Sequence, residues 1–206
     1  MRYEELVINC LGASNTRILI DEDGVKRSDL NYPSMLAEIL DCTVRNYGVS
    51  GTNIAMKEGR ADSYFERAAL MEGGADVIII QGGGNDASHC LPLGETGSDD
   101  PYTYCGALKG LIENVKRSHP QAKIIVSTSM RKKRAPQKRT DGLTHLDFHN
   151  AFLSVCRMED VELLDFYNDP CLDPFDTESM PDGLHMSEKA CRHMAQVIAD
   201  KIKSLI

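Results

Sequence analysis

Short apolar runs alternate with stretches of helical periodicity along the whole chain. Five runs rich in β-branched and other apolar residues predict strands at about 5–11, 43–47, 76–81, 123–128 and 161–166. Between and after them, apolar residues recur at three- and four-residue spacing, which predicts helices around 33–40, 64–69, 104–115, 148–155 and 190–205. The last helix has the most regular apolar stripe, and Ser187 stands where a helix cap belongs.

This alternation predicts an α/β protein with three layers, α/β/α, around a five-stranded parallel sheet. Helices that connect parallel strands must bury their apolar stripes against the two faces of the sheet. No repeat, low-complexity tract or linker divides the 206 residues, so we expect a single domain over residues 1–206. In such folds ligands bind outside the carboxyl ends of the strands. The loops that follow these ends, and the segment before the last helix, are therefore where chemistry is expected.

Composition narrows the class of protein. Hydrophobic residues make up 42% of the chain and charged residues 26%, and no apolar stretch approaches the roughly 20 residues of a membrane span. The seven cysteines include no CxxC pair, which argues against a disulfide framework and a zinc ribbon. With an N-terminal segment unlike a signal peptide, the sequence predicts a cytoplasmic protein without a membrane partner. The net charge of -8 disfavours nucleic acid as a partner.

Four loops carry candidate chemistry. The first predicted strand leads into a glycine and three small residues, of which Ser14 is the one with a hydroxyl nucleophile. The second strand is followed by a loop containing Gly51, and the third by a glycine-rich turn containing Asn85. Asp182 and His185 stand three residues apart just before the last helix, where a turn would let the carboxylate accept a hydrogen bond from the imidazole.

Together these residues would suit acyl transfer. A serine nucleophile needs a base, a histidine base needs an orienting carboxylate, and the tetrahedral intermediate needs N–H donors for its oxyanion. Ser14, His185 and Asp182 are the candidates for the first three roles, and the oxyanion candidates are the backbone N–H groups of Ser14 and Gly51 with the Asn85 side chain. Taken singly, Ser14 would more often be a helix cap and Asp182 could be a turn residue, and it is their joint occurrence that favours catalysis.

The segments "GASN", "NYGVSG", "GGND" and "DGLH" resemble, in this order, the four blocks of the SGNH hydrolase family, also called GDSL esterases and lipases. The resemblance implies a flavodoxin-like sheet, no metal or organic cofactor, Ser14 as nucleophile, Asp182 and His185 completing the triad, and Gly51 and Asn85 as oxyanion donors. The first block of the family usually has an aspartate where this chain has Ala13. Since that aspartate supports the loop in the family, we expect activity to persist at a lowered rate.

A basic segment, "RKKRAPQKR" from Arg131 to Arg139, carries six positive charges after the fourth strand. A solvated flexible loop is the favoured interpretation, and the competing one is a patch that attracts an anionic substrate or contacts nucleic acid. Its candidate substrate-binding residues are Arg131, Lys132, Lys133 and Arg134. His145 and His149 share the spacing of a zinc pair on a helix, but no HExxH glutamate accompanies them, so no metal site is predicted.

The sequence therefore predicts a serine-dependent ester hydrolase that acts on a small molecule. Short-chain acyl or acetyl esters, such as acetylated carbohydrates, are the expected substrates, with a lysophospholipase or thioesterase as the alternative within the family. A second alternative is a non-catalytic binding protein in which "GASNTR" cradles a phosphate, as flavodoxin-like proteins do. That alternative gives no reason for "GGND" and "DGLH" to occur together.

Overall fold

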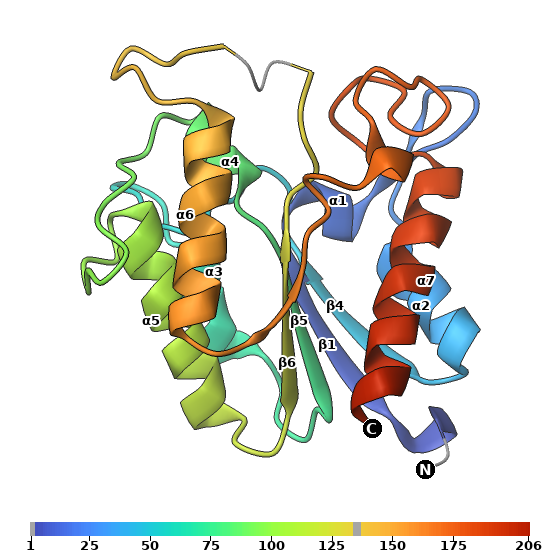
Figure 1. The fold of residues 1–206 in the computed structure, drawn as a ribbon. Helices are drawn as coiled ribbons and strands as arrows, with labels where there is room; N and C mark the ends of the chain where they lie inside the picture. The colour runs from blue at the N-terminus through green and yellow to red at the C-terminus, as the bar shows by residue number, and fades with distance from the viewer. Residues whose placement is uncertain (1–2, 134–136) are drawn as a thin grey trace.

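The computed structural model describes residues 3–133 and 137–206 and contains a five-stranded parallel sheet at its centre (Figure 1). The strands stand in the order β4-β1-β5-β6-β7, which is the flavodoxin-like order. Their bounds are β1 Val7–Gly12, β4 Thr43–Gly48, β5 Val77–Gly82, β6 Lys123–Thr128 and β7 Glu162–Leu164. The prediction of an α/β/α fold with five parallel strands is confirmed.

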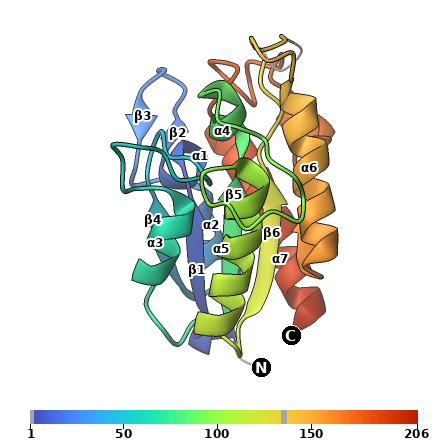
Figure 2. The ribbon, with the colours of Figure 1, turned by 90° about the vertical axis from the view of Figure 1, so that its left-hand side faces the viewer.

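Helices cover both faces of the sheet. One face packs against α2 (Tyr32–Leu40) and α7 (Glu188–Leu205), and the other against α3 (Tyr64–Arg67), α5 (Tyr104–Ser118) and α6 (His145–Met158) (Figures 1 and 2). Side chains of β1 alternate between the two layers, since Ile8 and Cys10 join the first core and Leu11 the second. This double burial explains why the strands read as nearly continuous apolar runs.

Side-chain caps fix where the helices begin, and with them the ends of the loops. Thr144 and Asp147 form a reciprocal capping box at the start of α6. The hydroxyl of Ser187 accepts a hydrogen bond from the backbone N–H of Ala190 at the start of α7, at the position predicted from the sequence. The chain segment that carries Asp182 and His185 is therefore held at its end by the capped start of α7.

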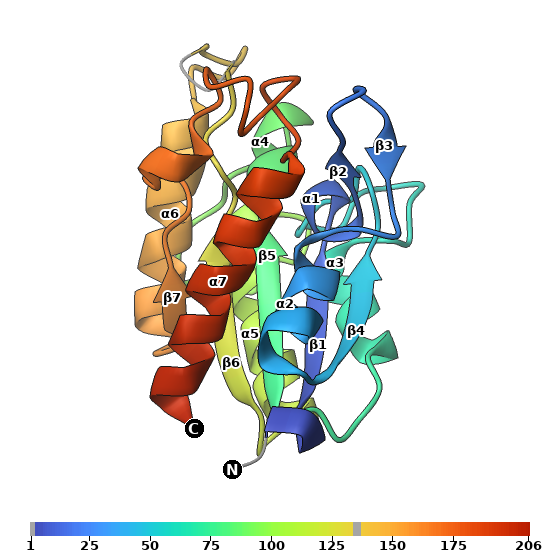
Figure 3. The same cartoon turned by 90° about the vertical axis from the view of Figure 1, so that its right-hand side faces the viewer.

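Several short elements at the carboxyl end of the sheet were not predicted from the sequence. Figure 3 shows the hairpin of β2 and β3 beside α1, above α2. These elements are α1 (Ser14–Arg17), β2 (Leu19–Ile20), β3 (Lys26–Arg27) and α4 (Gly84–Ser88). Three 3-10 turns lie elsewhere: Tyr3–Glu5 just before β1, Ala68–Leu70 continuing α3 within the expected helix 64–69, and Pro170–Leu172 after β7. Within the described ranges, none of the helices combines the length and apolar character needed to cross a membrane.

Candidate active site

Ser14 is the first residue of α1 and lies two residues after Gly12, the last residue of the interior strand β1. The turn between them requires glycine at position 12, because a Cβ there would lie 1.8 Å from Thr16 Oγ1. Ala13 occupies the cap position of α1 without a side-chain cap, and its carbonyl oxygen accepts the N–H groups of Thr16 and Arg17 at 3.2 and 3.1 Å. Backbone hydrogen bonds thus hold the turn that presents Ser14.

Asn15 ties this turn to the histidine segment. Its Nδ2 donates to the carbonyl oxygen of Leu184 at 3.1 Å, and its Oδ1 accepts the backbone N–H of Met186 at 3.1 Å. These two contacts flank His185 and join parts of the chain that are 169 and 171 residues apart. The Asn15 amide therefore helps to set the position of the imidazole relative to Ser14.

Asp182 and His185 form the hydrogen-bonded pair that the sequence predicts. His185 Nδ1 lies 2.7 Å from Asp182 Oδ2, and Asp182 Oδ1 accepts the backbone N–H groups of Leu184 at 2.9 Å and His185 at 2.6 Å. Partial burial acts to raise the pKa of Asp182, but these hydrogen bonds outweigh it and leave the pKa below its ordinary value. An ionised carboxylate holds the proton on Nδ1 and leaves Nε2 as the basic nitrogen.

A hollow of about 460 Å³ brings Ser14, His185, Gly51 and Asn85 together. Asp182 lies behind the imidazole and lines an adjoining hollow of about 690 Å³. Within the described residues the Ser14 hydroxyl makes no hydrogen bond to the imidazole. Contacts of this kind commonly tighten only when substrate is bound, so the shared hollow is the relevant observation.

Asn85, on α4, is oriented by two contacts on its amide. Its Nδ2 donates to the carbonyl oxygen of Thr52 at 2.9 Å, and its Oδ1 lies 3.3 Å from Lys132 Nζ. With the oxygen facing the lysine, the amide nitrogen keeps a second N–H for the hollow that Asn85 lines. Gly51, across this hollow, has a φ of 78°, a left-handed conformation that favours glycine.

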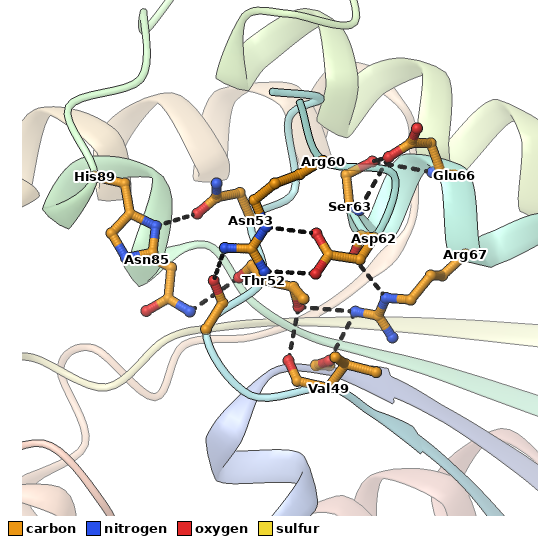
Figure 4. Close-up of polar contacts among 12 residues, drawn as sticks. Val49, Thr52, Asn53, Arg60, Asp62, Ser63, Glu66, Arg67, Asn85 and His89 are labelled. Atoms are coloured by element: carbon orange, nitrogen blue, oxygen red, sulfur yellow. Dashed lines mark hydrogen bonds and ion pairs between the residues drawn. The ribbon is translucent and has the colours of Figure 1, made fainter. Parts of the chain in front are cut away.

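The guanidinium of Arg67 is buried and supports the loop that carries Gly51. Figure 4 shows Arg67 beside Thr52 and Val49 of this loop. Arg67 Nη2 donates at 3.0 Å both to the carbonyl oxygen of Gly12 and to Thr52 Oγ1, and Nη1 donates to the carbonyl oxygen of Tyr47. Thr52 Oγ1 donates in turn to the carbonyl oxygen of Val49 at 2.8 Å. Burial lowers the pKa of Arg67, and the cation is satisfied by strand-end carbonyls. Arg67 therefore joins the ends of β1 and β4 to the loop that carries Gly51.

Asp86 and Lys132 connect α4 to neighbouring segments through hydrogen bonds. The Asp86 carboxylate accepts the backbone N–H groups of Ile54 at 3.0 Å and Ala55 at 2.9 Å, and burial raises its pKa to about 7. Lys132 Nζ donates to the carbonyl oxygen of Gly84 at 2.9 Å, and burial lowers its pKa to about 8. Lys132 thus supports the helix that carries Asn85.

The other basic residues singled out from the sequence lie nearer the surface. Arg131 Nη2 lies 3.7 Å from a carboxylate oxygen of Asp173, and Lys133 Nζ lies 5.7 Å from the centre of the Phe175 ring. Arg134 lies outside the described residues. Several cations line the 690 Å³ hollow, which adjoins the hollow that contains Ser14: Lys132, Lys133, Lys138 and Arg139.

The described residues contain one group suited to a metal ion. Ligand atoms of Asp169, Cys171 and His193 lie within 4.8 Å of one another, and none of these three residues belongs to the described lining of either hollow. His145 and His149 do not belong to the group: His145 lines the 690 Å³ hollow, and His149 stacks on Tyr167.

Two supporting residues escaped the sequence analysis. Asn15 offers no signal, because its partners are remote in the chain. Arg67 offers a weak one, since it interrupts the apolar stretch "YFERAALM" and is buried in the structure.

Comparison with known proteins gives matches over most of the chain. The model of the GDSL-like Lipase/Acylhydrolase family matches residues 10–192. One solved structure is 32% identical, covers 99% of this chain and of its own, and has a TM-score of 0.89. The inhibitor-bound aryl esterase of M. smegmatis is 18% identical, with coverage of 98% and 100% and a TM-score of 0.75. A carbohydrate acetylesterase from Sinorhizobium meliloti is 18% identical, with the same coverage and a TM-score of 0.70. The search of curated proteins gave no match.

Proposed function

Because the chain belongs to the GDSL-like lipase/acylhydrolase family and is therefore an ester hydrolase, we propose that it cleaves short-chain acyl esters through an acyl-enzyme at Ser14. The family predicted from four sequence blocks is confirmed. The observation that carries the proposal is the 460 Å³ hollow in which Ser14 meets His185, Gly51 and Asn85.

The reaction follows from the roles of these groups. Ser14 Oγ attacks the ester carbonyl while His185 Nε2 takes its proton, and Asp182 stabilises the imidazolium that forms. The oxyanion is received by the backbone N–H groups of Ser14 and Gly51 and by Asn85 Nδ2. His185 then gives the proton to the departing alcohol, and a water molecule activated by His185 hydrolyses the acyl-enzyme.

The lining of the hollow supports a small, polar substrate. Its volume of about 460 Å³ is within the range of small-molecule sites, roughly 300 to 1,000 Å³. Among the described lining residues, only Ile18 and Leu184 supply large apolar side chains, which favours an acetyl group on a polar alcohol over a long acyl chain. The carbohydrate acetylesterase among the structural neighbours agrees with acetylated carbohydrates as the substrate class. A lysophospholipase or long-chain thioesterase would need a more extended apolar surface.

The substrate is proposed to be anionic, with the basic segment contributing to its binding. Lys132 and Lys133 line the 690 Å³ hollow beside the catalytic residues, and Arg131 and Arg134 belong to the same segment. Because Lys132 is also bonded to α4, Lys133→Gln is the cleaner test. It should raise KM for an anionic ester and weaken the salt dependence of KM.

Two broader proposals complete the account. Residues 1–206 form one domain, supported by a single five-stranded sheet that takes in strands from β1 near the start of the chain to β7. The protein acts in the cytoplasm, which seven free cysteines support because thiols persist in reducing compartments.

The test is a series of p-nitrophenyl esters from acetate through butyrate and octanoate to palmitate, run beside acetylated sugars. The expected result is a kcat/KM that is highest for the short esters, with Ser14→Ala reduced to the blank. Turnover that survives in Ser14→Ala would eliminate the mechanism, and a preference for palmitate would eliminate the short-chain specificity. Absence of both turnover and labelling by a fluorophosphonate would favour the non-catalytic alternative.

A further inference from the structure

Two cations from separate elements line the same hollow as Ser14 and His185. Arg17 is the last residue of α1, one helical turn after Ser14, and Lys26 is the first residue of β3. Residues three apart on a helix lie on one side of it, so the Arg17 side chain emerges near the nucleophile. Both side chains belong to residues that are exposed to solvent.

Neither charge is neutralised by a described residue. In the ranges 3–133 and 137–206, no ion pair involves Arg17 or Lys26. The described lining of the 460 Å³ hollow also includes no aspartate or glutamate. On a protein with a net charge of -8, this leaves a local excess of positive charge beside the nucleophile.

The neighbouring residue on the same strand, Arg27, differs because its charge is paired with carboxylates. Its Nε donates to Asp29 Oδ1 at 2.9 Å, and its Nη1 lies 3.8 Å from a carboxylate oxygen of Asp21. Successive side chains of a strand point to opposite faces, which explains why Lys26 lines the hollow and Arg27 does not. The two residues therefore form a natural pair of test and control.

Hydrogen bonds anchor the backbone of the two elements that carry Arg17 and Lys26. Ile20, which pairs with Lys26 in the hairpin, donates its N–H to the carbonyl oxygen of Met186 at 2.9 Å, next to His185. The carbonyl oxygen of Arg17 accepts Nδ2 of Asn31 at 3.0 Å. The hairpin and α1 are thus anchored to the histidine segment and to α2, while the two charged ends stay available to a ligand.

We propose that Arg17 and Lys26 form an anion subsite of the catalytic hollow, which selects esters that bear a carboxylate or a phosphate close to the scissile bond. This rests on the proposed function, since it assumes ester cleavage at Ser14. A neutral sugar acetate would form no ion pair with these two unpaired cations. The planar guanidinium of Arg17, in contrast, can bind a carboxylate or a phosphate through two hydrogen bonds. Exposed charge pairs contribute modestly, so each cation should favour the anionic ester roughly two- to five-fold.

The experiment compares esters that differ in charge at similar shape. Mono-p-nitrophenyl glutarate against p-nitrophenyl butyrate places the anion on the acyl side. On the alcohol side, 3-acetoxybenzoate and 3-acetoxyphenyl phosphate are compared with 3-acetoxybenzamide. The measured quantity is the ratio of kcat/KM for the anionic ester to that for the neutral ester, in the wild type and in Arg17→Gln, Lys26→Gln, the double variant and Arg27→Gln.

The ratio should fall about two- to five-fold in each single variant and roughly four- to 25-fold in the double variant, and should stay at the wild-type value in Arg27→Gln. Raising the salt concentration should lower the wild-type ratio. The ester pair whose ratio falls most identifies the preferred anion, carboxylate or phosphate, and shows whether it lies on the acyl or the alcohol side. An unchanged ratio in the double variant in every arm, or an equal fall in Arg27→Gln, would overturn the subsite. Because Ser14→Ala tests cleavage separately with neutral esters, a failed subsite is distinguishable from a failed mechanism.

Discussion

Replacing Asn15 by alanine should impair catalysis beyond what it costs in stability. The substitution removes the amide that donates to the carbonyl oxygen of Leu184 and accepts from the N–H of Met186. No other side chain in the described residues takes over either contact. The turn that carries Ser14 and the segment that carries His185 would then be joined only through the hairpin and the backbone.

The size of the effect follows from the two contacts. Met186 is buried, so its N–H loses its partner without gaining water, at a cost of about 1 to 3 kcal/mol, and the Leu184 contact adds about 1 kcal/mol. For a protein of this size, that corresponds to a decrease in Tm of roughly 4 to 16 °C. A small displacement of the imidazole from Ser14 can cost on the order of 100-fold in rate. We therefore expect kcat to fall between about tenfold and 100-fold, with KM changed less.

The assay measures kcat and KM with p-nitrophenyl acetate, and Tm by circular dichroism, in Asn15→Ala and in a control, Asn31→Ala. Asn31 caps α2 through Ser34 and donates to the carbonyl oxygens of Arg17 and Ser28, so its loss should lower Tm comparably. Among the described residues, none of its hydrogen bonds reaches the histidine segment. The reasoning is refuted if the two variants lose the same kcat, or if Asn15→Ala keeps the wild-type kcat.

Three further predictions concern the groups that support α4 and the loop that carries Gly51. Burial raises the pKa of Asp86 from an ordinary 3.8 to about 7, so the folded protein binds more protons than the unfolded chain between these values. Stability should thus fall as the pH rises from about 4 to about 7, and urea midpoints across this range should lose that slope in Asp86→Asn. With a neutral ester, Lys132→Met removes the contact to Asn85 Oδ1 and should lower kcat roughly tenfold with little change in KM; a wild-type kcat would show that Lys132 does not position the amide. Arg67→Met leaves strand-end carbonyls and Thr52 Oγ1 without their donor and should lower the free energy of unfolding by about 2 to 3 kcal/mol in urea titration, whereas a loss below about 0.5 kcal/mol would contradict its structural role.

The main strands and helices could be predicted because their residues carry the period of the element they form. β5 has six buried residues in succession, as a central parallel strand requires, and α7 repeats its apolar positions through Ile202. The hairpin of β2 and β3 escaped prediction because its strands have two residues each and both residues of β3 are exposed. No hydrophobic pattern marks such an element, and the contact between Ile20 and Met186 that anchors it spans most of the chain.

The loops that carry the candidate site could be predicted from the sequence, but the residues that contact and position them could not. The order of parallel strands brings the loops after β1, β4 and β5 to one edge of the sheet, so Ser14, Gly51 and Asn85 could be grouped from the sequence. The roles of Asn15 and Arg17 could not, because each depends on which remote residues meet it. The departure at Ala13 likewise became interpretable only with the contacts of its neighbour, which hold the loop without an aspartate.

The central claim is that Ser14 is the nucleophile, and it can be measured by mapping the site of a covalent adduct. The protein is treated with a fluorophosphonate, digested, and analysed by mass spectrometry, with His185→Gln in parallel. The account predicts one adduct, on Ser14, that forms as esterase activity is lost and that forms far more slowly in His185→Gln. Loss of activity with the adduct on another residue, or full activity with Ser14 modified, would contradict it.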